Sequence, residues 1–175
     1  RHTRFKCDWS SDVCSSDLHV TMYGAIFVRK GERTVASEAD LAGRSLIVLN
    51  GDLAHDYAIQ QGWTNHLVLV DDTAAGLQLL ASGRHDAMLV GKLVGLNSLS
   101  QHGIRNVRPL PGRIDFHQKF AFAVMKNRPK SPELLARINE GLALVKANGT
   151  YDDLYEKWFG VLEPRTISKI GRAHV

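Results

Sequence analysis

The sequence predicts an α/β domain built on a parallel sheet, and two patterns indicate it. Short runs of apolar and β-branched residues alternate with longer segments whose apolar residues recur at helical spacing. Glycine follows each of the helical segments, as it does where helices end. Strands that alternate with helices of this length favour a parallel sheet covered by its crossover helices. A composition of 44% hydrophobic and 23% charged residues is that of an ordinary globular protein.

The predicted strands are short apolar runs bounded by turn residues. In chain order they span Thr21–Val28, Leu46–Leu49, Leu67–Val70, Asp86–Val90, Asn106–Leu110 and Lys119–Met125. The second run is apolar throughout, which is the pattern of a strand that is buried on both faces. Arg29–Gly31 and Pro111–Gly112 provide turns after the first and fifth strands.

The predicted helices begin at capping residues. They span Leu53–Gln61, Thr73–Ser82, Lys92–Gln101, Ser131–Ala147 and Tyr151–Phe159, with a short helical turn at Ser37–Leu41. Asp52 and Asp72 are the predicted N-caps of the first two helices. Ser37 followed three residues later by Asp40 predicts a capping pair. Ser131 before Pro132 predicts a cap with proline at the first helical position.

The two ends of the chain resemble translated sequencing-adapter sequence. Residues 7–18 read CDWSSDVCSSDL and residues 170–175 read IGRAHV. We therefore expect residues 1–18 and 169–175 to be artefactual and disordered, the alternative being natural Ser/Asp-rich tails. Both cysteines and several basic residues lie there, so the formal net charge of +4 is poor evidence for a nucleic-acid partner. No secretory signal and no apolar run of membrane-spanning length can be read in the sequence.

Several segments together resemble the family 3 bacterial extracellular solute-binding proteins. Residues 145–160, VKANGTYDDLYEKWFG, are similar to the C-terminal signature of that family. Upstream segments fit the family in the same order: AIFVRKG (25–31), DLAGRSLIVLNGD (40–52), LLASGRHDAMLV (79–90) and FAFAVMK (120–126). The ordered set is more specific than any one of its upstream members.

The resemblance implies the type 2 periplasmic binding protein fold, in which two α/β lobes are joined by two crossover strands and clamp a solute in their cleft. It implies a solute-binding domain over residues 19–160, with a second lobe at about 31–116, crossover strands at about 21–30 and 117–126, returning first-lobe helices at 131–160, and an extension or linker at 161–168. The part of the first lobe that carries an aromatic clamp and a carboxylate-binding arginine in the family would precede this chain. We therefore expect half a pocket, and weak solute binding by the chain alone.

In the family, a loop after the first strand of the second lobe receives a ligand carboxylate. The matching residues are Gly51, Asp52 and Leu53, directly after Asn50. Backbone amides at a helix N-terminus suit an anion, but Asp52 would repel a carboxylate and could occupy the anion site itself. The alternative is that Asp52 acts only as an N-cap. His55, one turn into the helix, could donate to a ligand or serve packing.

A second loop commonly carries an aspartate for the ligand's ammonium in the family, but here the matching residues are Gly91 and Lys92. Lys92 could bind a carboxylate or phosphate, or be a solvated surface lysine. These departures imply a solute other than an ordinary α-amino acid. Tyr23 could line the cleft or pack in the core. No cofactor is expected, and the histidines lack metal-ligand spacing.

The sequence therefore predicts a periplasmic module that binds a small polar solute. It would work with an ABC permease, or as the extracytoplasmic sensor of a histidine kinase or cyclase. Val161–Arg165 continue beyond the WFG of residues 158–160, which favours the sensor. The alternatives are an enzyme on the same fold, such as a dehydratase, and a gene fragment without independent function. No P-loop, GxSxG or GxGxxG motif supports an enzyme.

Overall fold

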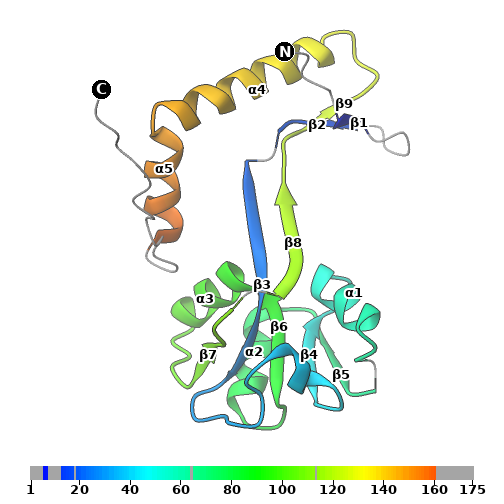
Figure 1. Ribbon diagram of the computed structural model, residues 1–175, viewed down its shortest axis with the longest axis vertical. Coiled ribbons are helices and arrows are strands. Elements are labelled where there is room, and N and C mark those ends of the chain that lie inside the picture. Colours follow the sequence, from blue (N-terminus) through cyan, green and yellow to red (C-terminus); the bar gives the residue numbers. More distant parts are fainter. Residues whose placement is uncertain (1–5, 8–12, 18, 64, 113, 161–175) are drawn as a thin grey trace. The chain divides into compact units, whose positions relative to one another are not determined.

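A computed structural model describes residues 6–7, 13–17, 19–63, 65–112 and 114–160 (Figure 1). The chain divides into two compact units. One unit is continuous, Leu18–Phe120, and the other combines Arg1–Asp17 with Ala121–Val175. Among the described residues, no helix combines the length and the apolar character that a bilayer span requires.

The continuous unit is built on a mixed sheet. Its strands are β3 (Val20–Arg29), β4 (Leu46–Leu49), β5 (Leu67–Val70), β6 (Ala87–Gly91), β7 (Val107–Pro109) and β8 (Ile114–Phe120). The order is β5-β4-β6-β3-β7, and β8 also pairs with β3. β4, β5 and β6 are parallel, as predicted, whereas β3 is antiparallel to each of its neighbours β6, β7 and β8. The prediction of a parallel sheet was thus wrong at β3, which reaches β4 through residues 30–45; these contain the single helical turn Glu38–Leu41 and no crossover α-helix.

The helices of this unit begin where the sequence predicted. They are η1 (Glu38–Leu41), α1 (Leu53–Gln60), α2 (Thr73–Ala81) and α3 (Lys92–Gln101). The Asp52 carboxylate accepts the Leu53 N–H at 2.8 Å, and the Asp72 carboxylate accepts the Ala75 N–H at 2.8 Å. The Asp40 carboxylate accepts the Ser37 N–H at 2.9 Å. The three predicted capping sites are therefore confirmed.

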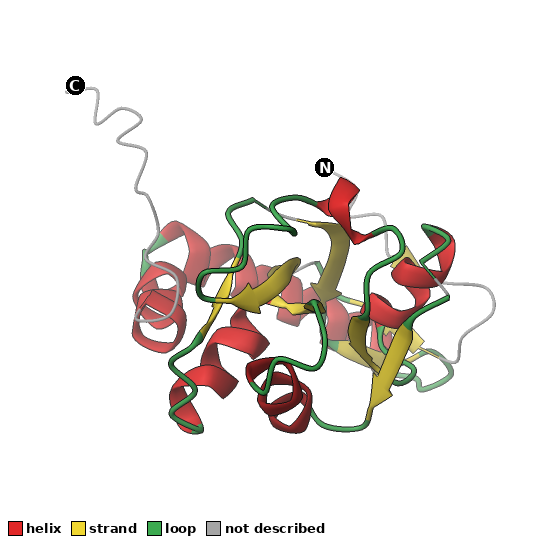
Figure 2. Cartoon of the chain, turned by 90° about the horizontal axis from the view of Figure 1, so that it is seen from below, coloured by secondary structure: helices red, strands yellow, loops and turns green. Residues whose placement is uncertain are grey.

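Apolar side chains fill both faces of the sheet, as the alternation of residues along a strand requires. On one face Ile26 and Val28 pack with Val48 and with Ala54 and Ala58 of α1. On the other face the core is formed by Ala25, Phe27, Ile47, Leu77, Leu80, Met88 and Leu99, which include residues of α2 and α3. The strands accordingly lie between helices (Figure 2). Leu46, Ile47 and Val48 are fully buried, which confirms the prediction from their unbroken apolar run.

The two predicted crossover segments lie side by side within this unit. The first residues of β3 pair with β8 from Val20↔Phe120 to Tyr23↔His117, and after a bulge Gly24 pairs with Ile114 (Figure 1). The predicted strand Lys119–Met125 is instead two strands, because β8 ends at Phe120 and β9 spans Ala123–Met125. The two strands join different sheets, so no single strand continues through residues 121–122.

The second unit contains a small antiparallel sheet and the C-terminal helices. Its strands are β1 (Lys6–Cys7), β2 (Val13–Ser15) and β9 in that order. Its helices are α4 (Ser131–Ala147), α5 (Thr150–Tyr155) and a π-helical turn, η2 (Glu156–Gly160). The expectation of disorder over residues 1–18 is wrong for Val13–Ser15, because this strand pairs with all three residues of β9. Cys14 is disulfide-bonded.

Two details of the helices in this unit differ from the sequence prediction. Lys130 is the N-cap of α4, so Ser131 is its first residue and not its cap. The helix predicted over Tyr151–Phe159 ends at Tyr155 and continues as η2. The helices of this unit also carry exposed apolar side chains: Trp158 is 66% exposed, and Leu134, Leu144 and Leu154 are at least half exposed.

Candidate functional site

Three helices begin at one edge of the large sheet. We call this the carboxyl-terminal edge: the residues that follow β4, β5 and β6, which are Asn50–Leu53, Asp71–Asp72 and Gly91–Lys92. Because the three strands are parallel, their carboxyl ends meet there. Ligands of open α/β sheets bind outside the carboxyl ends of the strands. All residues that the sequence nominated lie at this edge or directly beside it.

The loop before α1 satisfies its own amide groups. The N–H of Gly51 donates to Nδ1 of His55 at 3.2 Å, and that of Leu53 donates to the Asp52 carboxylate at 2.8 Å. The N–H of Asp52 donates to the Leu49 carbonyl at 3.3 Å, and that of Asn50 to the Val70 carbonyl at 2.9 Å. Each amide that was expected to receive a ligand carboxylate therefore already has a partner.

His55 makes an internal contact, which agrees with the structural one of the two roles that the sequence left open. Its Nδ1 accepts the hydrogen bond that the Gly51 N–H donates. Gly51 adopts a φ of +71°, a conformation that glycine tolerates best. The imidazole thus holds the glycine turn against the first turn of α1, and Nδ1 is not a donor to a ligand.

The start of α3 is built differently from that of α1. β6 continues directly into α3, whose N-cap Gly91 provides no side-chain hydrogen bond. Gly91 pairs with Gly24 of β3, next to the bulge that follows Tyr23. Tyr23 and Lys92 are both half-buried. The structure therefore brings the predicted residues Tyr23, Gly91 and Lys92 together through one strand pairing.

The neighbouring strand adds Asn50 to this group. In the parallel pairing of β4 with β6, Val48 lies opposite Leu89. That pair is the last of the ladder, and Asn50 and Gly91 each follow it by two residues along their own strands. The two predicted loops thus follow adjacent strands at the carboxyl-terminal edge. Adjacent strands of a sheet lie roughly 5 Å apart.

Two acidic residues at this edge, Asp71 and Asp72, were not nominated from the sequence as site residues. Asp71 and Asp72 follow β5 and are exposed, and Asp52 is half-buried after β4. The signal was present, since Asp71 and Asp72 directly follow the apolar run Leu67–Val70, but Asp72 was interpreted only as a helix cap. Together with Lys92 these carboxylates give the edge both signs of charge, which suits a small polar or zwitterionic molecule.

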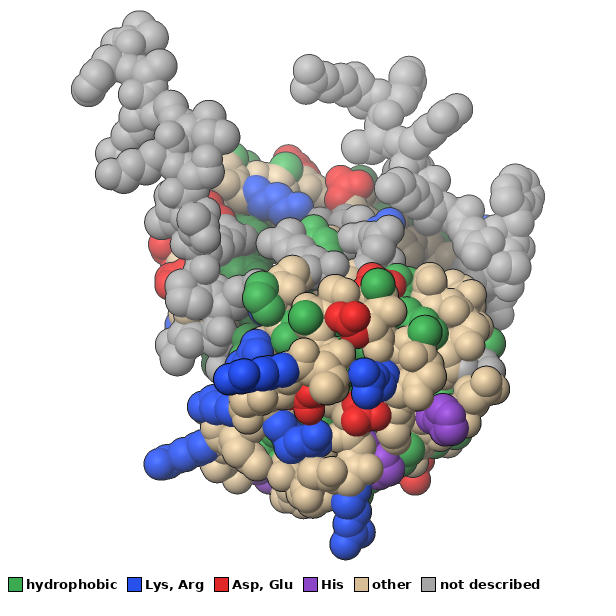
Figure 3. All heavy atoms as spheres, turned by 60° about the horizontal axis from the view of Figure 1, so that its bottom comes forward, with side chains coloured by type: hydrophobic (Ala, Val, Ile, Leu, Met, Phe, Trp, Pro, Cys, Tyr) green, Lys and Arg blue, Asp and Glu red, His purple; other side chains and the backbone are tan. Residues whose placement is uncertain are grey.

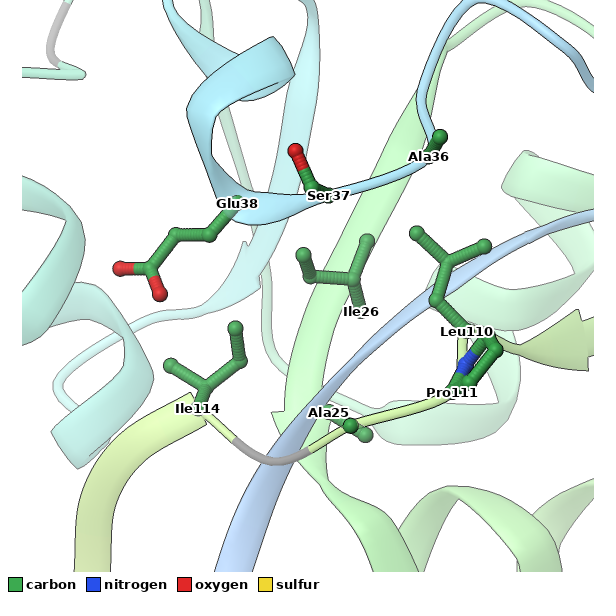
Figure 4. A pocket seen from close by; sticks show the side chains of 9 residues that line it. Ala25, Ile26, Ala36, Ser37, Glu38, Leu110, Pro111 and Ile114 are labelled. Atoms are coloured by element: carbon green, nitrogen blue, oxygen red, sulfur yellow. The ribbon is translucent and has the colours of Figure 1, made fainter.

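A separate pocket lies beside β3 and contains none of the nominated residues. It has a volume of about 130 Å³ and is lined by Ala25, Ile26, Ala36, Ser37, Glu38, Leu110, Pro111, Gly112 and Ile114 (Figure 4). The Glu38 carboxylate at its wall accepts a hydrogen bond from the Tyr57 hydroxyl at 2.5 Å. Ligand pockets usually enclose roughly 300–1,000 Å³, so we assign this small apolar hollow to packing.

The sheet order, the paired crossover strands and the loops at the carboxyl-terminal edge define a class: the α/β lobe of a type 2 periplasmic binding protein. Residues 12–161 match the family model described as bacterial extracellular solute-binding proteins, family 3. The chain belongs to this family. In the part of the chain that the structure describes, no group of His, Cys, Asp and Glu is arranged to hold a metal ion.

Individual relatives agree with this assignment. The chain is 28% identical over 155 residues to the L-cystine-binding protein TcyA of Bacillus subtilis, covering 89% of this chain and 56% of that one. A crystallised histidine kinase sensor domain is 32% identical with a TM-score of 0.71, covering 89% and 68%. An ancestral arginine-binding protein bound to arginine is 31% identical with a TM-score of 0.69, covering 85% and 65%. The chain spans about half the length of the curated cystine-binding relatives.

Proposed function

We propose that this chain is the second-lobe part of an extracytoplasmic module that binds a small polar solute without chemical turnover. The solute would contact Tyr23, Asn50, Gly91 and Lys92 at the carboxyl-terminal edge. Gly51, Asp52, Leu53 and His55 would form the adjoining wall. One observation carries the proposal: the strand pairing of Gly24 with Gly91 brings both nominated loops and the first crossover strand to one place.

An anionic group of the solute would bind at Gly91 and Lys92 and not at the loop before α1. That loop donates its amides internally and carries the Asp52 carboxylate. α3 begins without a side-chain cap, so its N-terminus favours an anion, and the Lys92 ammonium adds a full charge of the same sign. Asp71 and Asp72 would favour a cationic group in the same solute.

The relatives support a solute of amino-acid size. Those compared above are named for binding cystine and arginine or for sensing. For this chain, a zwitterionic solute fits the mixture of Lys92 and aspartates best. The module itself would lie in the periplasm. Its partner would be an ABC permease, or the transmembrane and kinase or cyclase parts of its own parent protein.

Isothermal titration with a panel of amino acids, polyamines and organic acids tests the proposal. We expect binding of a solute that carries a carboxylate, and Lys92→Gln should weaken it by at least about tenfold, since a charge-assisted hydrogen bond is lost. Lys119→Gln, which removes an exposed lysine elsewhere, should leave the affinity unchanged. Equal affinities for the wild type and Lys92→Gln would contradict the proposed site.

The substitution Asp52→Asn distinguishes the helix-capping role of Asp52 from the effect of its charge on solute binding. Asparagine keeps a side-chain oxygen for the Leu53 N–H, so the stability of α1 should persist. Removal of the negative charge should strengthen binding of the carboxylate-bearing solute by a few fold in the same titration. Weaker binding would instead show that Asp52 contacts a cationic group of the solute.

A further inference from the structure

The charged residues of the continuous unit are divided between its two ends. Its exposed acids Asp56, Asp71 and Asp72 lie at or near the carboxyl-terminal edge. Its opposite end carries a set of exposed basic residues that we call the basic pole: Lys30, Arg33, Arg84 and Arg105. Figure 3 shows Lys and Arg side chains on this face of the molecule, with a few acidic side chains among them.

Hydrogen bonds hold the loops of the basic pole together. The Lys30 N–H donates to the Asn106 carbonyl at 2.6 Å, which joins the end of β3 to the loop before β7. The side-chain amide of Asn106 donates to the Ala81 carbonyl at 3.0 Å, which connects this loop to the end of α2. The Arg29 guanidinium donates to the His85 carbonyl, in the turn between α2 and β6. Lys30, Arg84 and Arg105 are therefore fixed on one surface although they are far apart in the sequence.

The acidic groups at this end have internal partners. Glu32 pairs with Arg29 at 3.2 Å and accepts hydrogen bonds from Thr34, and its side chain is only 12% exposed. Asp86 accepts the Ser45 N–H at 2.9 Å, and Asp40 accepts from Ser37. Within the described residues, none of the four side chains of the basic pole forms an ion pair. Their charges are thus presented to solvent.

We propose that the basic pole is a docking surface for an anionic phospholipid membrane. Basic clusters close to an anionic bilayer gain about 1 kcal/mol per Lys or Arg, and they need no shaped partner. A stable protein interface usually has an apolar centre. Of the exposed large apolar residues of this unit, Leu53 and Val94 lie at the starts of α1 and α3 and Phe120 lies at the end of β8, away from the basic pole; Ile59, near the end of α1, is a single apolar side chain at the pole's end of the unit. The charge distribution would orient the carboxyl-terminal edge away from the lipid.

Vesicle co-sedimentation of the full chain tests the docking surface. The vesicles contain phosphatidylglycerol mixed with phosphatidylcholine, or phosphatidylcholine alone, at low and high NaCl concentration. We expect binding only to the anionic vesicles and release at high salt, since exposed charges are screened. The triple variant Lys30→Gln, Arg84→Gln, Arg105→Gln should lower the partition coefficient by at least about tenfold.

A matched variant controls for net charge. Lys119→Gln, Lys130→Gln, Lys157→Gln removes the same number of exposed charges outside the basic pole and should bind within about twofold of the wild type. Equal losses in the two variants would overturn the proposal, because the binding would then follow total charge. Retention on immobilised polyglutamate without vesicle binding would also overturn it, in favour of an acidic protein partner. Circular dichroism of both variants verifies that they are folded.

Discussion

At the scale of single residues, Gly24 is the most constrained position beside the candidate site. It pairs with Gly91 on one side and with Ile114 on the other. A Cβ atom at this position would lie 2.1 Å from the ring of Phe116, which is 6% exposed. The ring fills the space that a side chain would need, so the close approach of β8 to β3 depends on the absence of that side chain.

Gly24→Ala should therefore destabilise the continuous unit by about 1–3 kcal/mol, the usual range for overpacking a filled core. The change in the urea midpoint measures this loss. Phe116→Leu, which shortens the opposing ring, should recover part of the loss in a double-mutant cycle. An equal cost of Gly24→Ala in both backgrounds would show that the contact with Phe116 is not the cause.

At the scale of elements, the loop after β3 is organised by one carboxylate. Glu32 accepts from the Thr34 hydroxyl and N–H, both at 2.7 Å, and from the Arg33 N–H at 2.9 Å, and it pairs with Arg29. Hydrogen bonds to Thr34, followed by that to Arg33 and the charge of Arg29, lower the pKa of Glu32 from 4.5 to about 2. These interactions favour the ionised form in the folded state.

This lowered pKa predicts a stability contribution with a definite sign. A group whose pKa is lower in the folded state stabilises the fold above its unfolded pKa, and this contribution is lost as the pH falls from about 4.5 towards 2. Urea titrations of the wild type and Glu32→Gln should therefore differ most above pH 4.5 and converge near pH 2. Glu140→Gln changes an exposed position of α4. Its free energy of unfolding should differ from that of the wild type by the same amount at every pH.

Elements that are specified by local sequence were predicted best. α3 spans Lys92–Gln101 in both the prediction and the structure, and the Asp52 and Asp72 caps are in place. β8 was missed over residues 114–118, because this segment, IDFHQ, is too polar to stand out as a strand. It is extended because β3 lies beside it. A pairing between residues about 90 positions apart leaves no local pattern to detect.

The loops that the sequence nominated follow strands that end at one edge of the sheet, but their hydrogen bonds could not be predicted. The residues after β4 and β6 could be nominated because parallel strands end at a common edge. The hydrogen bond from Gly51 to His55 could not be inferred, since it depends on the φ of +71° at Gly51 and on a side-chain rotamer. That bond engages Nδ1 of His55 within the loop itself.

At the scale of the whole molecule, the two units differ in how completely each encloses its own core. The continuous unit, residues 18–120, has apolar clusters on both faces of its sheet. In the other unit the long helix α4 buries only Ser131 and Leu135. A unit that has its own hydrophobic core and an uninterrupted chain meets the requirements for independent folding.

A polypeptide of residues 18–120 should therefore fold alone. We expect a cooperative urea transition and dispersed amide resonances, whereas residues 121–175 alone should show neither. The circular dichroism of the two fragments and the full chain makes the comparison. A non-cooperative transition of 18–120 would mean that its stability depends on contacts with the other unit.

The pairing of Gly24 with both Gly91 and Ile114 has a mechanical consequence. β3 and β8 form a two-stranded ribbon beyond the sheet, and the bulge after Tyr23 is where that ribbon meets the body of the sheet. When the ribbon twists, either the backbone at the bulge changes conformation, or Gly24 moves together with its partner Gly91 at the start of α3. A molecule bound against Gly91 would stiffen this junction. Binding at the carboxyl-terminal edge and the twist of the β3–β8 ribbon would then change together.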